Sequence, residues 1–214
     1  MTEKLGPKIR SLSMSLEHFK KDKVFYDAIK HITLSDHNPS DNYFHYLLRA
    51  IAFQQLSGKA GATIHGRFLL LFPDQNPEPA FLLELEHEAL RGVGLSGQKA
   101  GYMKNIADFW LKEDLNNTRI DGMSDEEVLA YLTQIKGVGK WTVEIFLMFG
   151  MGRPDLFPLD DLGLQQGIAG IYGLKHLPLK ELKKEMVRIS DGWRPHRTKA
   201  ALYVWRWKDE GEFW

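Results

Sequence analysis

The chain has 214 residues, no cysteine, and equal numbers of acidic and basic side chains, so its formal net charge at pH 7 is zero. The absence of cysteine excludes disulfides, thiolate zinc sites, thiol nucleophiles and cysteine-bound iron–sulfur clusters. No apolar run is long enough to cross a membrane, and the charged N-terminus is not followed by an apolar segment, which argues against secretion.

Helical patterns follow one another along the chain. We expect residues 1–12 to be a loose, polar lead-in and the first helical turns to lie between residues 16 and 32. Asp, Asn, Pro and Ser at 36–42 predict a break. Residues 43–53 are apolar nearly all round, which predicts a buried central helix. Further helices are predicted at 59–72, 80–90 and 98–111, with a break at Asn116-Asn117. Because no segment shows sustained alternation with a period of two, the predicted fold class is all-α.

A helix–hairpin–helix pattern covers about residues 124–150. Ser124 and Glu127 fit a capping box at the start of the first helix. Gly137-Val138-Gly139 ends that helix, and a second helix begins at about Lys140. The unpaired backbone N–H groups at the start of the second helix suit a phosphate, although a Gly-x-Gly alone often only terminates a helix.

Two adjacent carboxylates, Asp160 and Asp161, stand where a third helix should begin. One can cap that helix while the other points away, and an aspartate at a helix start is usually only a cap. A charged helix follows Pro178, and the last helix is expected to begin near Pro195. The basic residues near the C-terminus could form a local basic face; they are Arg188, Arg194, Arg197, Lys199, Arg206 and Lys208.

These motifs carry a resemblance. Leu-x-x-Ile-Lys-Gly-Val-Gly-Lys-Trp-Thr at 132–142, followed by Pro-Leu-Asp-Asp-Leu at 158–162, resembles the helix-hairpin-helix DNA glycosylase superfamily. Within it, the chain is similar to the 3-methyladenine DNA glycosylase II family, in a compact form without the extra N-terminal domain. Residues 48–57 and 193–205 also resemble family segments. The likeness extends over about residues 40–207.

The resemblance implies two helical lobes, with the active-site cleft between them, in one glycosylase domain at 13–214. It implies a monofunctional DNA glycosylase of base excision repair that flips out alkylated purines, such as 3-methyladenine and 7-methylguanine, and hydrolyses the N-glycosidic bond. Asp161 takes the catalytic position, and Trp141 and Trp205 take aromatic positions of the base pocket. Relatives that also cleave the strand have a Schiff-base lysine where this chain has Trp141.

The resemblance also assigns the contacts to DNA. The hairpin residues expected to bind the backbone are Gly137, Val138, Gly139, Lys140 and Thr142. Gln55 or Leu56 would fill the gap left by the extruded base. The resemblance also allows a structural Na⁺ or K⁺ bound by the backbone carbonyls of Thr133, Ile135 and Val138, and the sequence does not choose between the ions. No other cofactor or metal site is expected.

Alternatives remain at this stage. Without the resemblance, residues 54–57 read as a polar turn between helices, and both tryptophans read as core residues. A non-catalytic helix-hairpin-helix protein that binds damaged or distorted DNA would keep the glycines and Lys140 but would not need Asp161. The expected partner is double-stranded DNA containing alkylated bases, and the expected state is a monomer away from membranes. The expected compartment is intracellular, which is the cytoplasm in a bacterium and the nucleus in a eukaryote.

Overall fold

The computed structural model describes residues 12–35 and 38–210. The described residues form helices and no strand, which confirms the predicted all-α fold. The predicted lead-in, 1–12, lies outside this part of the chain except for its last residue. The helices belong to two compact units: a central unit, Ser40–Phe146, and a terminal unit made of the described residues up to Pro39 and those from Leu147 on. Each unit is described by itself.

The central unit contains nine helical elements in the described chain. They are α3 (Tyr43–Phe53), α4 (Gly58–Leu69), the 3-10 turn η1 (Pro73–Gln75), α5 (Pro79–Glu84), α6 (His87–Gly92), α7 (Gly97–Lys112), α8 (Asn117–Asp121), α9 (Asp125–Leu132) and α10 (Lys140–Ile145). A π-helical turn, η2 (Phe146–Gly150), follows α10 directly, so the predicted second helix of the hairpin changes its winding after Ile145.

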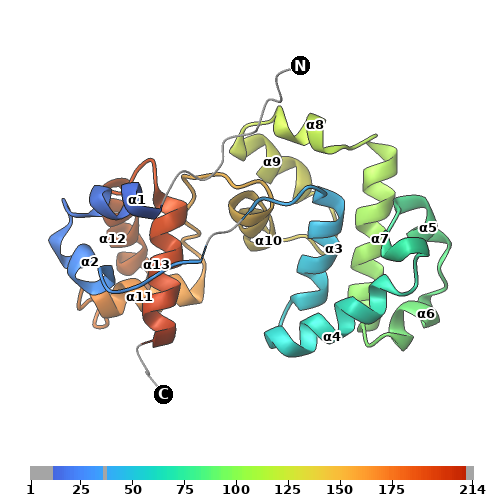
Figure 1. The fold of residues 1–214 in the computed structure, drawn as a ribbon, viewed down its shortest axis with the longest axis horizontal. Helices are drawn as coiled ribbons and strands as arrows, with labels where there is room; N and C mark the ends of the chain where they lie inside the picture. Colours follow the sequence, from blue (N-terminus) through green and yellow to red (C-terminus); the bar gives the residue numbers. More distant parts are fainter. Residues whose placement is uncertain (1–11, 36–37, 211–214) are drawn as a thin grey trace. The chain divides into compact units, whose positions relative to one another are not determined.

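The buried helix predicted at 43–53 is confirmed as α3. It packs on α4 and α7, and Figure 1 shows α3 and α7 running side by side. Leu47, Leu48 and Ile51 are fully buried, as are Met103 and Ile106 of α7. Burial of each such side chain contributes roughly 1.5–3 kcal/mol, so the α3–α7 contact is a major source of stability in this unit.

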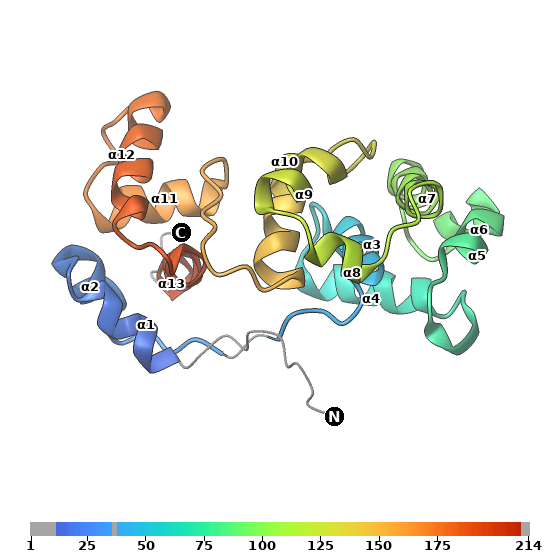
Figure 2. The same cartoon turned by 90° about the horizontal axis from the view of Figure 1, so that it is seen from above.

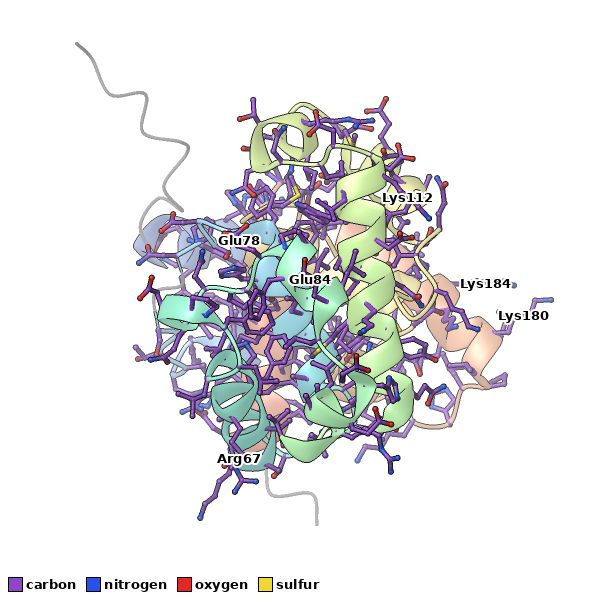
Figure 3. The ribbon with its side chains drawn as sticks, turned by 90° about the vertical axis from the view of Figure 1, so that its right-hand side faces the viewer. Arg67, Glu78, Glu84, Lys112, Lys180 and Lys184 are labelled. Carbon is purple, nitrogen blue, oxygen red and sulfur yellow. The ribbon has the colours of Figure 1, made fainter. Side chains whose placement is uncertain are left out.

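The prediction of a single helix at 80–90 is wrong, because the segment divides into α5 and α6. Lys104 on α7 donates hydrogen bonds from Nζ to the carbonyls of Leu83, at 3.1 Å, and Leu85, at 2.5 Å. These bonds satisfy carbonyls that the end of α5 leaves without helical partners. Figure 3 shows α5, with Glu84, lying against α7, whose last residue is Lys112.

Two other boundaries differ from the prediction. The break expected at Asn116-Asn117 is instead the start of α8, because the Asn116 side chain accepts the Arg119 N–H at 2.9 Å and caps the helix. The last helix begins at Arg197, two residues after Pro195.

The terminal unit packs its helices around a cluster of aromatic rings. Its helices are α1 (Leu12–Phe19), α2 (Lys23–Ile29), α11 (Leu162–Ile171), α12 (Leu179–Asp191) and α13 (Arg197–Glu210). α13 contacts α2, α11 and α12, and Figure 2 shows it nearly end-on. The rings of Phe25 and Trp193 stack with centroids 4.3 Å apart, and Phe19 meets Phe25 edge-on at 5.2 Å. Such pairs stabilise a core beyond their buried area.

Asp22 connects three parts of the terminal unit. Its Oδ1 accepts the Phe25 N–H at 3.1 Å and caps α2. Its Oδ2 accepts the Tyr172 hydroxyl at 2.5 Å and the Trp193 indole N–H at 3.2 Å. Burial raises the pKa of the Tyr172 hydroxyl, and the bond to Asp22 raises it further. A single carboxylate therefore satisfies donors from α2, the end of α11 and the segment before α13.

We predict that Asp22→Asn lowers the free energy of unfolding by about 2 kcal/mol, because the amide keeps one acceptor oxygen and loses the second. Chemical denaturation checks this. Asp27→Asn is the control, because Asp27 is exposed and forms i,i+4 and i,i+3 ion pairs with Lys23 and Lys30 on the same surface. No measurable change is expected for it. Equal losses in both variants would contradict the assigned role of Asp22.

Candidate active site and nucleic-acid interface

The predicted hairpin is present in the central unit. The capping box of α9 is confirmed: Ser124 Oγ accepts the Glu127 N–H at 3.2 Å, and Glu127 Oε2 accepts the Ser124 N–H at 2.8 Å. α9 ends at Leu132, and α10 begins at Lys140 with Gly139 as its N-cap. The turn between them is closed by the Val138 N–H, which donates to the Ile135 carbonyl at 3.0 Å.

Gly137 is required by the packing of the turn. Its φ is +105°, in the region that favours glycine. A Cβ at this position would lie 2.1 Å from Cγ of Tyr102, whose ring lies directly against the backbone. Asn105, one turn further along α7, donates from Nδ2 to the Lys136 carbonyl at 2.9 Å. α7 thus supports the inner side of the hairpin.

Gly139 differs from Gly137. Its φ is −85°, and a Cβ there would meet no atom within 4 Å. The backbone at Gly139 is exposed, as are Lys140 and Trp141, and 45% of the Trp141 surface is accessible. The N–H groups that open α10 therefore lie beside residues open to a ligand.

The side chains of Val138 and Thr142 are buried, unlike those of Lys140 and Trp141, so the expected contact of Val138 with DNA is not supported. Thr142 Oγ1 accepts a hydrogen bond from Gln54 Nε2 at 3.3 Å. This bond joins the start of α10 to the loop between α3 and α4. Only the backbone of Thr142, not its hydroxyl, is therefore suited to the DNA contact expected for it.

The loop between α3 and α4 carries the two residues expected to enter the duplex. Gln55 is exposed and has a φ of +57°, which is uncommon for a residue other than glycine. Leu56 is 39% exposed. Ser57 then caps α4 by accepting the Ala60 N–H at 3.4 Å. Both candidates project from a short loop between two helix ends, and the choice between them stays a prediction.

Asp161 and Trp205 meet in the terminal unit. Asp161 is the N-cap of α11: its Oδ1 accepts the Leu164 N–H at 2.8 Å. The same oxygen accepts the indole N–H of Trp205, on α13, also at 2.8 Å. Gly163 permits this approach, because a Cβ there would lie 3.0 Å from both Asp161 Oδ1 and Trp205 Cδ1. Of the adjacent carboxylates, Asp161 is therefore the cap, and it is also fixed by a second donor.

The other charges near these residues are balanced within the protein. Asp160 accepts a bond from Lys183 at 2.5 Å. Arg194 and Arg197 both bind Asp155, while the Arg188 and Arg206 guanidinium groups pair with glutamates on their own helices. Four of the six cations in the expected basic face thus have carboxylate partners.

The chain matches a known family over most of its length. Residues 48–195 match the family described as HhH-GPD superfamily base excision DNA repair protein. The chain belongs to this superfamily. The match includes the loop between α3 and α4, the hairpin and Asp161, whereas Trp205 lies beyond its end.

The chain is similar to several named proteins and to a solved structure. DNA-3-methyladenine glycosylase 1 of Schizosaccharomyces pombe is 35% identical over 75% of this chain and 70% of its own. A solved 3-methyladenine DNA glycosylase from the same yeast, in complex with abasic DNA, superposes with a TM-score of 0.79 at 30% identity, covering 90% of this chain and 95% of that one. A Bacillus subtilis relative is 34% identical over 76% of this chain, and the match covers 58% of that longer protein.

The described part of the chain contains no group of three or more His, Asp or Glu side chains that could hold a metal ion. None of its helices is both long and apolar enough to span a membrane. The backbone carbonyls of Thr133, Ile135 and Val138 are of the type that a hard monovalent cation accepts, and Ile135 already receives one N–H.

The terminal unit contains a pocket whose lining begins with Leu162, the residue directly after Asp161, but does not include Asp161. Its lining includes Leu162, Gln166, Ala169, Trp207 and Lys208, from α11 and α13. Asp161 and Trp205 are absent from the lining, so this pocket and the Asp161–Trp205 pair are different features of the unit.

Sequence reasoning missed the residues that support the site. Tyr102 and Asn105 lie on α7, more than 30 positions before the hairpin residues that they contact. The bond from Gln54 to Thr142 joins residues 88 positions apart. The single signal available was the i, i+3 spacing of Tyr102 and Asn105, which places them on one face of a helix without naming its partner.

The two hairpin glycines should respond differently to alanine. Gly137→Ala should lower the free energy of unfolding by about 2–4 kcal/mol, because the new Cβ meets the Tyr102 ring and the backbone has a positive φ. Gly139→Ala should cost less than about 1 kcal/mol, because alanine is a poorer N-cap than glycine, and should weaken binding to duplex DNA, because its methyl group occupies the space open to a phosphate. Denaturation and fluorescence-anisotropy titrations measure the two effects. A Gly139→Ala that loses as much stability as Gly137→Ala, or a Gly137→Ala as stable as the native chain, would contradict this division.

Proposed function

We propose that this protein is a monofunctional DNA glycosylase of base excision repair, which extrudes alkylated purines from duplex DNA and hydrolyses their N-glycosidic bond to leave an abasic site. The observation that carries the proposal is the Asp161 carboxylate, held by two N–H donors at 2.8 Å within a chain of this superfamily. The names of the relatives, DNA-3-methyladenine glycosylases from yeast and bacteria, support the substrate class.

The chemistry follows from the charge that develops in the reaction. Breaking the N-glycosidic bond passes through a transition state with positive charge on the sugar. A fixed carboxylate beside the sugar stabilises that charge and orients the attacking water. Both N–H donors bind Oδ1 of Asp161, so the carboxylate has a set orientation before substrate arrives. A methylated purine carries positive charge and leaves readily, so the reaction needs no strong general acid.

Base extrusion precedes the chemistry, because the bond is inaccessible inside a duplex. We assign reception of the base to Trp141 and Trp205. A cationic purine over an indole face gains from the ring quadrupole. The 45% exposure of Trp141 supports this assignment, since a tryptophan used only for packing is usually covered. Trp141 also occupies the position of the Schiff-base lysine in relatives that cleave the strand, which favours hydrolysis alone.

Two segments of the central unit are proposed to bind the DNA. The backbone N–H groups of Gly137, Gly139, Lys140 and Thr142 and the Lys140 side chain bind phosphates. Val138, expected in the same contact, is buried and its N–H already donates to the Ile135 carbonyl, so we do not assign it to a phosphate. Gln55 or Leu56 fills the space that the extruded base leaves. We further assign a Na⁺ or K⁺ to the carbonyls of Thr133, Ile135 and Val138, and a monomer acting on double-stranded DNA with alkylated bases.

Asp161→Asn tests the proposal. The amide oxygen can still accept both N–H groups, so the fold is expected to persist, while the loss of negative charge should slow base release by about 100-fold or more. Release of 3-methyladenine and 7-methylguanine from methylated duplex DNA, resolved by chromatography, measures this. Asp160→Asn is the matched control, because that carboxylate binds Lys183 instead.

The same experiment separates the enzyme from the second candidate, a non-catalytic protein that binds damaged DNA. Base release by the native chain and by Asp160→Asn, with loss only in Asp161→Asn, supports the enzyme. If the native chain binds methylated DNA and releases no base, the binding protein is the better description. Unchanged release by Asp161→Asn would overturn the role of this residue.

Trp205→Phe separates the hydrogen bond from the ring. The phenyl group keeps an aromatic face but loses the N–H that fixes Asp161 Oδ1, so base release should fall about tenfold, the cost of one such donor in the transition state. Single-turnover kinetics measure the rate. Trp207→Phe on the same helix is the control, because its ring lies against Gly170. Equal rates in the two variants would contradict a positioning role for the Trp205 N–H.

A further inference from the structure

The loop proposed to enter the duplex depends on a lysine that belongs to another helix. Lys99, in the first turn of α7, donates from Nζ to the carbonyl of Ala52 at 2.9 Å and to that of Gln54 at 2.7 Å. These carbonyls stand at the C-terminal end of α3, where helix carbonyls lack intrahelical partners and the dipole favours a cation. Partial burial of the Lys99 ammonium group lowers its pKa.

Hydrogen bonds hold Gln54, the residue directly before Gln55, whose backbone conformation is strained. The Gln54 N–H donates to Ala50 and Ile51, its carbonyl accepts from Lys99, and its side chain donates to Thr142. Gln55 follows with a φ of +57°. A residue other than glycine keeps such a backbone conformation only when its surroundings impose it. The fixed Gln54 supplies that constraint.

α7 holds the hairpin as well as this loop. Lys99, Tyr102 and Asn105 follow one another at intervals of three residues, so each lies next to the following one on the helix surface. Tyr102 lies against Gly137, and Asn105 binds the Lys136 carbonyl. One helix therefore sets the relative positions of the loop at 54–56 and the turn at 136–139 within the central unit.

We propose that Lys99 is a positioning residue for base extrusion. Its ammonium group fixes the end of α3 and so presents Gln55 and Leu56 to the duplex at a set distance from the hairpin, which the same helix, α7, supports. This rests on the proposed glycosylase function. Lys99 does not touch the substrate. It lowers the cost of ordering the loop at the moment when the base leaves the stack, which is the cost that preorganisation removes.

The chain contains a matched control on the same helix. Lys104 binds the carbonyls of Leu83 and Leu85 at the end of α5, through the same pair of lysine–carbonyl bonds. Lys99→Met and Lys104→Met each remove two charge-assisted bonds and keep an apolar side chain of similar length. Only Lys99→Met loosens the loop that carries Gln55.

The experiment has two readouts. Single-turnover base release from methylated duplex DNA should be about tenfold slower in Lys99→Met at saturating protein, whereas Kd for undamaged duplex should change by less than about twofold. The second probe is a duplex with a tetrahydrofuran abasic-site analogue beside 2-aminopurine, whose fluorescence rises when the stack is opened. Lys99→Met should show a smaller rise than the native chain. Lys104→Met should match the native chain in both readouts, and Lys99→Arg should recover most of the rate.

Equal behaviour of Lys99→Met and Lys104→Met in the fluorescence measurement would overturn the proposal. If the native chain releases no base, the proposed glycosylase activity fails, and the fluorescence comparison still decides the role of Lys99. Should Lys99→Met not fold, Lys99→Gln and Lys104→Gln provide the same comparison with one donor retained in each.

Discussion

The hydrogen bond from Trp205 to Asp161 is the constraint on which the proposed chemistry depends. A single carboxylate oxygen caps the start of α11 and also accepts an N–H from α13. The pair therefore forms only when these two helices pack against each other. Gly163 also contributes, because a Cβ there would lie 3.0 Å from both the carboxylate oxygen and the indole ring, so that one of them would have to shift. Capping stability and catalytic geometry are therefore properties of the same atoms. An aspartate used only as a cap would not need the indole.

The central unit solves a different problem, which is to hold two short loops without covering them. The turn at 136–139 exposes its backbone at Gly139, and the loop at 54–56 exposes Gln55 and Leu56, so neither can be stabilised by burial on its outer side. Support comes from beneath, through the ring of Tyr102, the amide of Asn105 and the bond between Gln54 and Thr142. Rigid elements below exposed loops are a common way to position binding groups.

Local signals predicted the elements, and tertiary contacts decided the rest. The capping box at Ser124, the Gly137 turn and the largely apolar α3 could be predicted because each depends on residues close in sequence. The single helix expected at 80–90 failed because Lys104, on another helix, satisfies carbonyls where α5 ends. Asp161 could be identified only through the family motif, since a cap and a catalytic carboxylate have the same local pattern. The 44 positions between Asp161 and Trp205 left their bond out of reach.

The zero net charge also becomes understandable from these contacts. Arginine side chains that a DNA-coating protein would use to bind phosphates bind carboxylates here, as the half-exposed Arg194 and the more buried Arg197 do with Asp155. Lys99 and Lys104 bind backbone carbonyls. Cations that bind carboxylates or backbone carbonyls of the protein add little to non-specific attraction for phosphates, because that attraction depends on the number of charges neutralised at the interface. Recognition would then depend on a few N–H groups of the hairpin and on the ease of opening the stack. A damaged base pair, which separates at lower cost than an intact one, is favoured by such a protein over the undamaged majority.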